Sequence, residues 1–286
     1  MSLTIPRSAA RMLVAGVIAL TLAGGLVGCG DEGGEDGGGS GTPDPTGTAS
    51  ATTVNTGVYY TVDTRAGFRL ARELRDLPGE EPGREAVETM IAGPVDPDYA
   101  TTWDPGTEVL GVADSGGTIE VDLSAEARTA NVGSEGAALM VQQLVYTVTE
   151  ALDAEAEVLL LVEGEPAGEL WGTLVWDEPI GRADPLDVRL LVQIDQPGED
   201  VTTSSPLRVE GEAAVFEAML GWRVLDEAGD EVIAGNTMTA EGQTFAPFMF
   251  PVELDPGLYV VEIFEEDASG GEGGAPMTDT RTVTIE

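Results

Sequence analysis

The hydrophobic pattern divides the chain into segments of different character. Residues 12–28 are apolar or small and carry no charge, and residues 30–54 contain almost no large apolar side chains. Apolar residues return at Val58 and recur from there to the end of the sequence. A segment without apolar side chains cannot bury a core. We therefore expect a flexible Gly/Asp/Thr-rich tether over 29–56 and a folded region from residue 57.

Residues 57–181 mix helical and strand-like patterns. Two segments, 84–92 and 134–152, have apolar residues on one helical face, and Ser134 is the predicted N-cap of the second. Short β-rich runs predict strands at 58–62, 68–74, 109–112, 118–123 and 158–162. A helix is the alternative for 68–74. The mixture predicts an α+β domain, an antiparallel sheet with helices on one face.

From residue 188 to 286 the pattern contains strands and turns but no convincing helix. The predicted strands are 188–194, 207–209, 222–225, 248–254, 258–264 and 281–285. Turns rich in Gly, Pro and Asp separate many of them. This rhythm predicts an all-β immunoglobulin-like sandwich. Residues 182–187 are the predicted linker between the two domains.

The N-terminal segment has the features of an export signal. Arg7 and Arg11 precede the apolar run, which is too short and too rich in Gly and Ala to match the ~20 strongly apolar residues of a membrane-spanning helix. The run ends at Leu26-Val27-Gly28-Cys29, which resembles the lipobox of bacterial lipoprotein precursors. An ordinary signal or an uncleaved anchor is the alternative.

The lipobox resemblance implies a lipid anchor. It implies that the signal peptide, residues 1–28, is removed and that the thiol of Cys29, the new N-terminus, carries a diacylglycerol. Two acyl chains are enough for stable membrane attachment. The expected location is extracytoplasmic, on the outer face of the bacterial cell membrane.

Composition narrows the chemistry. All 13 basic residues are Arg, His is absent, and Cys29 is the only cysteine. These absences exclude a Ser-His-Asp triad, a His metal ligand and a disulfide within the chain. We predict no catalytic residue, no metal site and no cofactor.

The chain is strongly acidic, with a formal net charge of −39. Nucleic acid and anionic headgroups are therefore excluded as expected partners, because they would be repelled. A solvated acidic surface, adaptation to high salt and calcium binding remain as alternatives, although no stretch has the spaced pattern of a calcium loop.

Blocks in both folded regions resemble known families. Residues 117–124, 144–149 and 158–164 are similar to the GerMN domain of sporulation and germination proteins. Residues 205–213 and 245–248 are similar to the Gmad-type immunoglobulin-like domain of bacterial spore germination. GerMN domains resemble ring-building modules, which implies an oligomer through this domain, and some occur in LpqB-type lipoproteins linked to a sensor kinase.

Together these features predict a membrane-anchored lipoprotein that acts as a non-catalytic binding or scaffold module. Its expected partner is an envelope protein or a cell-wall component. A regulator of a membrane sensor kinase is one alternative. A carboxylate-based cell-wall glycan hydrolase is another, because acid pairs such as Glu80-Glu81 and Asp177-Glu178 are frequent and two carboxyls ~5–9.5 Å apart can cleave a glycosidic bond.

Three aromatic residues are candidate partner contacts: Trp171, Trp176 and Tyr146. Trp171 and Trp176 are five residues apart, so in an extended strand they point to opposite faces and at most one faces solvent. Tyr146 lies off the apolar stripe of its predicted helix, and packing at the sheet edge is its alternative role. Trp222, inside a predicted strand, is expected in the core.

Overall fold

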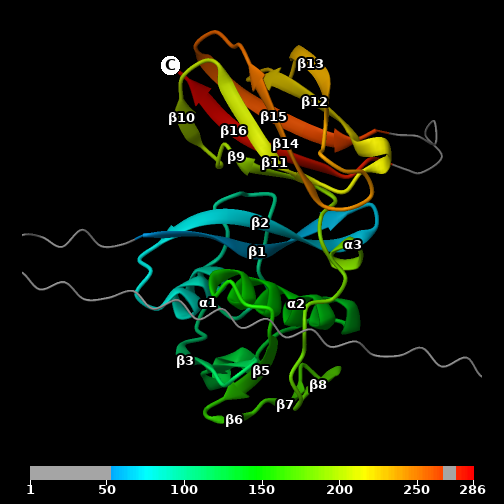
Figure 1. Cartoon of the computed structure of the whole chain (residues 1–286). Coiled ribbons are helices and arrows are strands. Elements are labelled where there is room, and N and C mark those ends of the chain that lie inside the picture. Colours follow the sequence, from blue (N-terminus) through cyan, green and yellow to red (C-terminus); the bar gives the residue numbers. More distant parts are fainter. Residues whose placement is uncertain (1–52, 267–274) are drawn as a thin grey trace, which may run out of the picture. The chain divides into compact units, whose positions relative to one another are not determined.

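Figure 1 shows the computed structural model, which describes residues 53–266 and 275–286. The predicted signal peptide, the lipobox Leu26-Val27-Gly28 and Cys29 lie outside the described residues, as does most of the tether. Within the two described ranges, no helix is long and apolar enough to cross a membrane.

The α+β part is built from a long hairpin, two helices and a mixed sheet. The hairpin pairs β1 (Val54–Thr64) with β2 (Gly67–Leu77). The helices are α1 (Pro82–Ala92) and α2 (Ser134–Ala151). The sheet has the order β3-β4-β5-β6, formed by Val109–Asp114, Thr118–Leu123, Glu157–Val162 and Glu165–Pro166. In Figure 1 the helices lie between the hairpin and this sheet.

One strand pair in the sheet is parallel. β3 and β6 pair antiparallel with their neighbours, whereas β4 and β5 run in the same direction. Parallel neighbours need a crossover of a dozen or more residues, and α2 supplies it. Shorter elements complete this part: η1 (Ala125–Arg128), β7 (Gly168–Leu170), β8 (Leu174–Trp176) and α3 (Pro185–Val188).

Helix α2 is buried on more than its apolar stripe, because the hairpin covers its other side. Gln143 Nε2 donates to the carbonyl oxygen of Tyr59 on β1 at 3.0 Å, and Tyr59 N donates to Thr147 Oγ1 at 3.1 Å. The predicted cap is wrong: Gly133 is the N-cap, Ser134 is the first helical residue, and no side chain caps the helix.

The C-terminal part is a two-sheet sandwich. One sheet has the order β14-β11-β9, formed by Ala246–Val252, Leu207–Ala213 and Val192–Gln196. The other has the order β10-β16-β15-β12-β13, formed by Val201–Thr203, Thr278–Ile285, Gly257–Glu265, Met219–Asp226 and Glu231–Met238. Trp222 of one sheet stacks on Phe250 of the other, with ring centroids 4.7 Å apart. The short helical turn η2 (Phe216–Ala218) precedes β12.

The predicted fold class, an α+β region followed by an all-β sandwich, is confirmed. Residues 68–74 are strand rather than helix, and Trp222 is buried as expected. The short strands β6, β7 and β8 of the α+β part were missed, and so were two strands of the sandwich. β13 is largely exposed along its length and therefore lacks the alternation that marks a half-buried strand, and β10 has only three residues.

Candidate functional site

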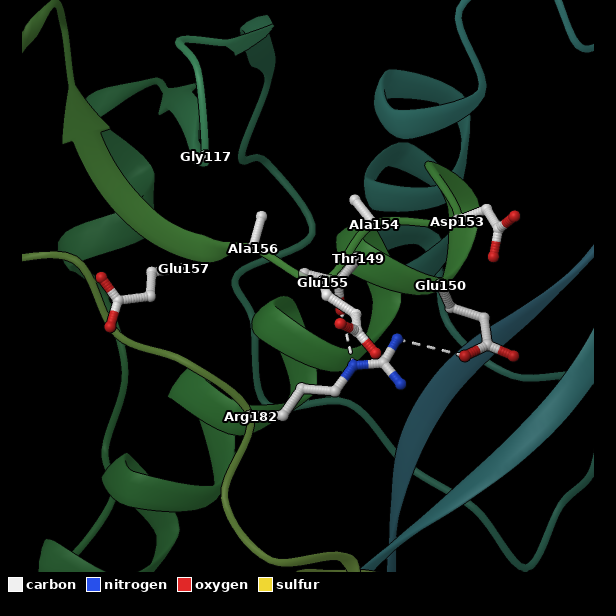
Figure 2. A pocket seen from close by; sticks show the side chains of 9 residues that line it. All are labelled: Gly117, Thr149, Glu150, Asp153, Ala154, Glu155, Ala156, Glu157 and Arg182. Atoms are coloured by element: carbon white, nitrogen blue, oxygen red, sulfur yellow. Dashed lines mark hydrogen bonds and ion pairs between the residues drawn. The ribbon is translucent and has the colours of Figure 1, made fainter. Parts of the chain in front are cut away.

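An open cavity of about 670 Å³ lies where the C-terminal end of α2 meets the start of β5 (Figure 2). The chain turns back here through Asp153, whose φ of 47° is in the left-handed region. The lining residues are mostly acidic or small: Gly117, Thr149, Glu150, Asp153, Ala154, Glu155, Ala156, Glu157 and Arg182.

Arg182 is the single cation of this cavity lining. Its Nε donates to Thr149 Oγ1 at 2.7 Å, and its Nη2 lies 3.1 Å from the carboxylate of Glu150. Arg72 contacts the same carboxylate from β2 at 3.4 Å. The carboxylate of Glu150 is therefore shared by two guanidinium groups.

Two of the remaining acids of the cavity, Asp153 and Glu157, do not face each other. In Figure 2 the side chains of Asp153 and Glu157 point away from each other on opposite sides of Arg182. A glycosidase needs its two carboxyls across the scissile bond. Asp153 and Glu157 therefore do not form such a pair.

A buried ionic cluster joins the α+β part to the sandwich. Arg281 on β16 donates to Asp96, in the loop after α1, at 2.7 Å and to Asp279 on β16 at 2.9 Å. Tyr99 donates to Asp279 at 2.7 Å and accepts from Arg281 at 2.9 Å. All four residues are at most 5% exposed. The cluster closes onto β9, because Ile194 N donates to Asp279 and Ile194 O accepts from Arg281.

This cluster holds two carboxyl groups against one guanidinium group, and burial governs their protonation. Burial raises the pKa of Asp96 to about 7, although the charge of Arg281 opposes the shift. Burial also raises the pKa of Asp279. A small cavity of about 210 Å³ adjoins the cluster. The groups that act on Asp96 come from both parts of the chain: Arg281, Asp98, Asp279 and Glu199.

A second cluster lies on the hairpin side of the same junction. Arg72 on β2 contacts Asp195 and Glu212, each at 2.7 Å. Arg189 contacts Glu212 at 2.5 Å. Burial alone would raise the pKa of Glu212, but Arg189 and Arg72 outweigh burial and hold its pKa below the ordinary value. Gln193 completes the contact by accepting from the backbone N–H of Arg72.

We expect the free energy of unfolding of the Asp96→Asn variant to depend less on pH than that of the wild type. The folded protein keeps the Asp96 proton between about pH 4 and pH 7, where the unfolded chain has lost it, so wild-type stability falls as pH rises through this range. Asparagine removes this titration. The free energy of unfolding of the variant relative to wild type should therefore rise by about 1–3 kcal/mol between pH 4.5 and pH 8.

Urea unfolding at the two pH values measures this difference. Asp63→Asn, which removes one exposed carboxylate from β1, is the matched control and should follow the wild type. Parallel profiles for Asp96→Asn and wild type would show that Asp96 does not titrate in this range.

The three aromatic candidates do not form one surface. Trp176 and Tyr146 are buried, and their assignment as partner contacts is corrected on that ground. Trp176 donates to Val158 O at 3.2 Å, and the Tyr146 hydroxyl donates to Ala183 O at 2.7 Å. Trp171 is half-buried, donates to Ala127 O and meets Trp103 edge to face at 5.7 Å. Of the three, only Trp171 is not fully buried.

The predicted linker, residues 182–187, is held against the folded parts. Arg182 is bound to α2 as described above, and Asp184 caps α3 by accepting from Leu186 N. Leu190 N, just beyond the linker, donates to Leu70 O on β2 at 2.8 Å. Among the residues that the structure describes, no group of three or more His, Cys, Asp or Glu side chains is arranged to hold a metal ion.

In the described fold, an α+β region precedes an immunoglobulin-like sandwich. Residues 43–168 match the family described as sporulation and spore germination (Germane). Residues 191–272 match the immunoglobulin-like domain of bacterial spore germination (Gmad2). The chain thus carries a Germane, or GerMN-like, domain followed by a Gmad2 domain, which confirms both predicted resemblances.

Solved structures give partial likenesses. The first GerMN domain of the sporulation protein GerM from Bacillus subtilis is 25% identical, with a TM-score of 0.37, and the match covers 46% of this chain and 100% of that one. The tandem GerMN domains of GerM are 18% identical, with a TM-score of 0.37, over 71% of this chain and 62% of that one. A candidate lipoprotein from Clostridium perfringens is 17% identical, with a TM-score of 0.33, over 45% and 87%. No protein of curated function matches the chain significantly.

Proposed function

We propose that the protein is a lipoprotein of the bacterial envelope that acts as a non-catalytic scaffold. A diacylglycerol on Cys29 holds it on the outer face of the cell membrane, and the tether separates the folded domains from the lipid. The lipobox Leu26-Val27-Gly28-Cys29 supports the anchor, and the two germination-type domains support a role in the envelope.

The buried junction is the observation that carries the scaffold role. A tethered pair of independent domains needs no contact between them, whereas here Arg281 and Arg72 bind carboxylates across the junction. Buried ion pairs tolerate little displacement, because an unpaired buried charge is costly. The two domains therefore present their surfaces to a partner in one fixed relation.

The partner is an envelope protein or a cell-wall component. The net charge of −39 disfavours nucleic acid and other polyanions. Oligomerisation through the Germane domain stays a prediction, as do the domain boundaries drawn from the sequence. A purified chain that cleaves peptidoglycan fragments would overturn the non-catalytic part of the proposal.

Replacement of Cys29 tests the anchor. In the full chain expressed in a bacterial host, Cys29→Ala should leave the membrane fraction, because no thiol remains to carry the acyl chains. The wild-type N-terminal peptide should show the mass of diacylglyceryl Cys29 in mass spectrometry. Gly30→Ala, one residue further on, is the control and should remain membrane-bound. A mature wild-type N-terminus other than acylated Cys29 would contradict the proposal.

A further inference from the structure

Strand β13 is an unprotected sheet edge. It is the last strand of its sheet and pairs with β12 alone, from Met219↔Met238 to Leu225↔Glu231. Within the described ranges, no strand pairs with its other side. Its outer N–H and C=O groups are therefore available to another chain.

The side chains of this edge are apolar and exposed. Val232 is 50% exposed, Ile233 40% and Met238 61%, and Met219, directly opposite Met238 on β12, is 40% exposed. Edge strands are usually guarded by charged residues or proline. β13 has one charged residue, Glu231, and no proline, in a chain with 52 acidic residues. A bulge lies at Val232, which has no partner on β12 because Val224 pairs with Ile233 and Leu225 with Glu231, and it distorts this end of the strand.

We propose that β13 pairs antiparallel with β13 of a second copy, with the two-fold axis at Gly235. A two-fold pairing through one residue keeps the same sheet face on the same side in both copies. It places Val232 of one copy opposite Met238 of the other copy, next to Met219 on β12 of that other copy. The exposed apolar side chains of the two copies then cover one another. Glu231 falls outside the paired residues, and the two acids do not face each other. The two outer sheets become one continuous sheet.

The charge pattern favours a second copy over other occupants. Strand β13 itself carries one carboxylate, Glu231, and Asn236 holds a second one, that of Glu266, so a basic segment would find few carboxylates here. An acidic segment would be repelled by the chain as a whole. An uncharged strand of the same length fits, and the protein itself supplies one. This inference goes beyond the proposed function and does not rest on it.

Salt dependence follows from the same charges. Each copy carries a net charge of −39, and this repulsion opposes association. The screening length falls from ~10 Å at 0.1 M salt to ~3 Å at 1 M. The dimer should therefore strengthen as salt is added, opposite to an interface held by ion pairs.

Sedimentation of the full chain in mild detergent tests the pairing at 0.1 M and 1 M NaCl. We expect a monomer–dimer equilibrium that shifts to dimer at high salt. Val232→Lys should weaken dimerisation by at least about tenfold, because lysine on the edge opposes apolar side chains of the second copy. Leu258→Lys adds the same charge at a 42% exposed leucine on β15 and should leave dimerisation unchanged.

Two results would overturn the proposal. One is a monomer at both salt concentrations. The other is a dimer that survives Val232→Lys but is lost in Leu110→Lys, which alters a 45% exposed leucine on β3 and would place the interface in the Germane domain. Circular dichroism of each variant establishes that it is folded before its association is compared.

Discussion

Replacement of Arg281 by alanine should lower the free energy of unfolding by about 3–5 kcal/mol, because it leaves the carboxyl groups of Asp96 and Asp279 buried without a counter-charge. The guanidinium group also donates to Tyr99 and to Ile194 O, and both acceptors lose their partner.

The loss should depend on pH in a defined direction. Without the cation, the buried carboxyls keep their protons to higher pH than in the unfolded chain, so the variant loses more stability as pH rises. Urea unfolding at pH 5 and pH 8 measures both the loss and its change. Arg208→Ala removes an exposed ion pair with Glu210 and should cost about 0–1 kcal/mol. An equal loss in the two variants would show that the cluster contributes little.

Replacement of Gly211 by alanine should destabilise the sandwich by about 3 kcal/mol, at the upper end of what overpacking costs. A Cβ atom at this position would lie 1.9 Å from the carbonyl oxygen of Gln193 on β9 and 2.7 Å from the ring of Phe248. A carbonyl oxygen in a sheet cannot move without disturbing its strand pairing. The clash therefore falls on the pairing of β11 with β9, which is already irregular between Glu210 and Gly211.

Thermal and urea unfolding compare this variant with Gly111→Ala. Gly111 also lies in a strand, β3, but a Cβ there would meet no atom within 4 Å. The control should unfold at the same temperature and urea concentration as the wild type or at higher ones, because alanine lowers the conformational entropy of the unfolded chain. A wild-type midpoint for Gly211→Ala would mean that β9 and β11 separate more easily than their contact suggests.

Much of the fold could be predicted from the sequence because apolar residues follow the period of each element. The stripe of α2 and the run of β5 identified both elements within a residue or two. The parallel pairing of β4 with β5 was missed, because period alone does not give strand direction. The second buried face of α2 was missed because it carries Gln143 and Thr147, which are polar in sequence but bonded to β1 in the structure.

The junction was missed for a similar reason, although β16 held a signal. Asp279 and Arg281 occupy the same alternate positions as the buried residues Val283 and Ile285. Charged residues in phase with a core-facing strand indicate a buried ion pair. Their partner Asp96 is separated from them by most of the chain, and only the folded structure shows that it meets Arg281.

The aromatic candidates show the limit of residue type as a guide. Trp176 and Tyr146 have the large rings and polar tips that often mark a binding surface, yet both bury the ring and bond the tip to a backbone carbonyl. The exposed strand β13 has aliphatic and methionine side chains but no aromatic residue, and the sequence did not show that it lies at the edge of its sheet.

Arginine is the only type of basic residue at the junction, and this determines how the stability of the junction depends on pH. Guanidinium groups stay charged at every pH at which the protein folds, so only the carboxyls respond. The Asp96 cluster becomes less stable as pH rises through about 7, the pKa of Asp96. The Glu212 cluster loses its ionic contacts as pH falls, at a lower pH than an ordinary glutamate would, because the pKa of Glu212 is lowered. Because the two clusters respond to pH in opposite directions, the junction between the two parts is most stable in a mildly acidic medium.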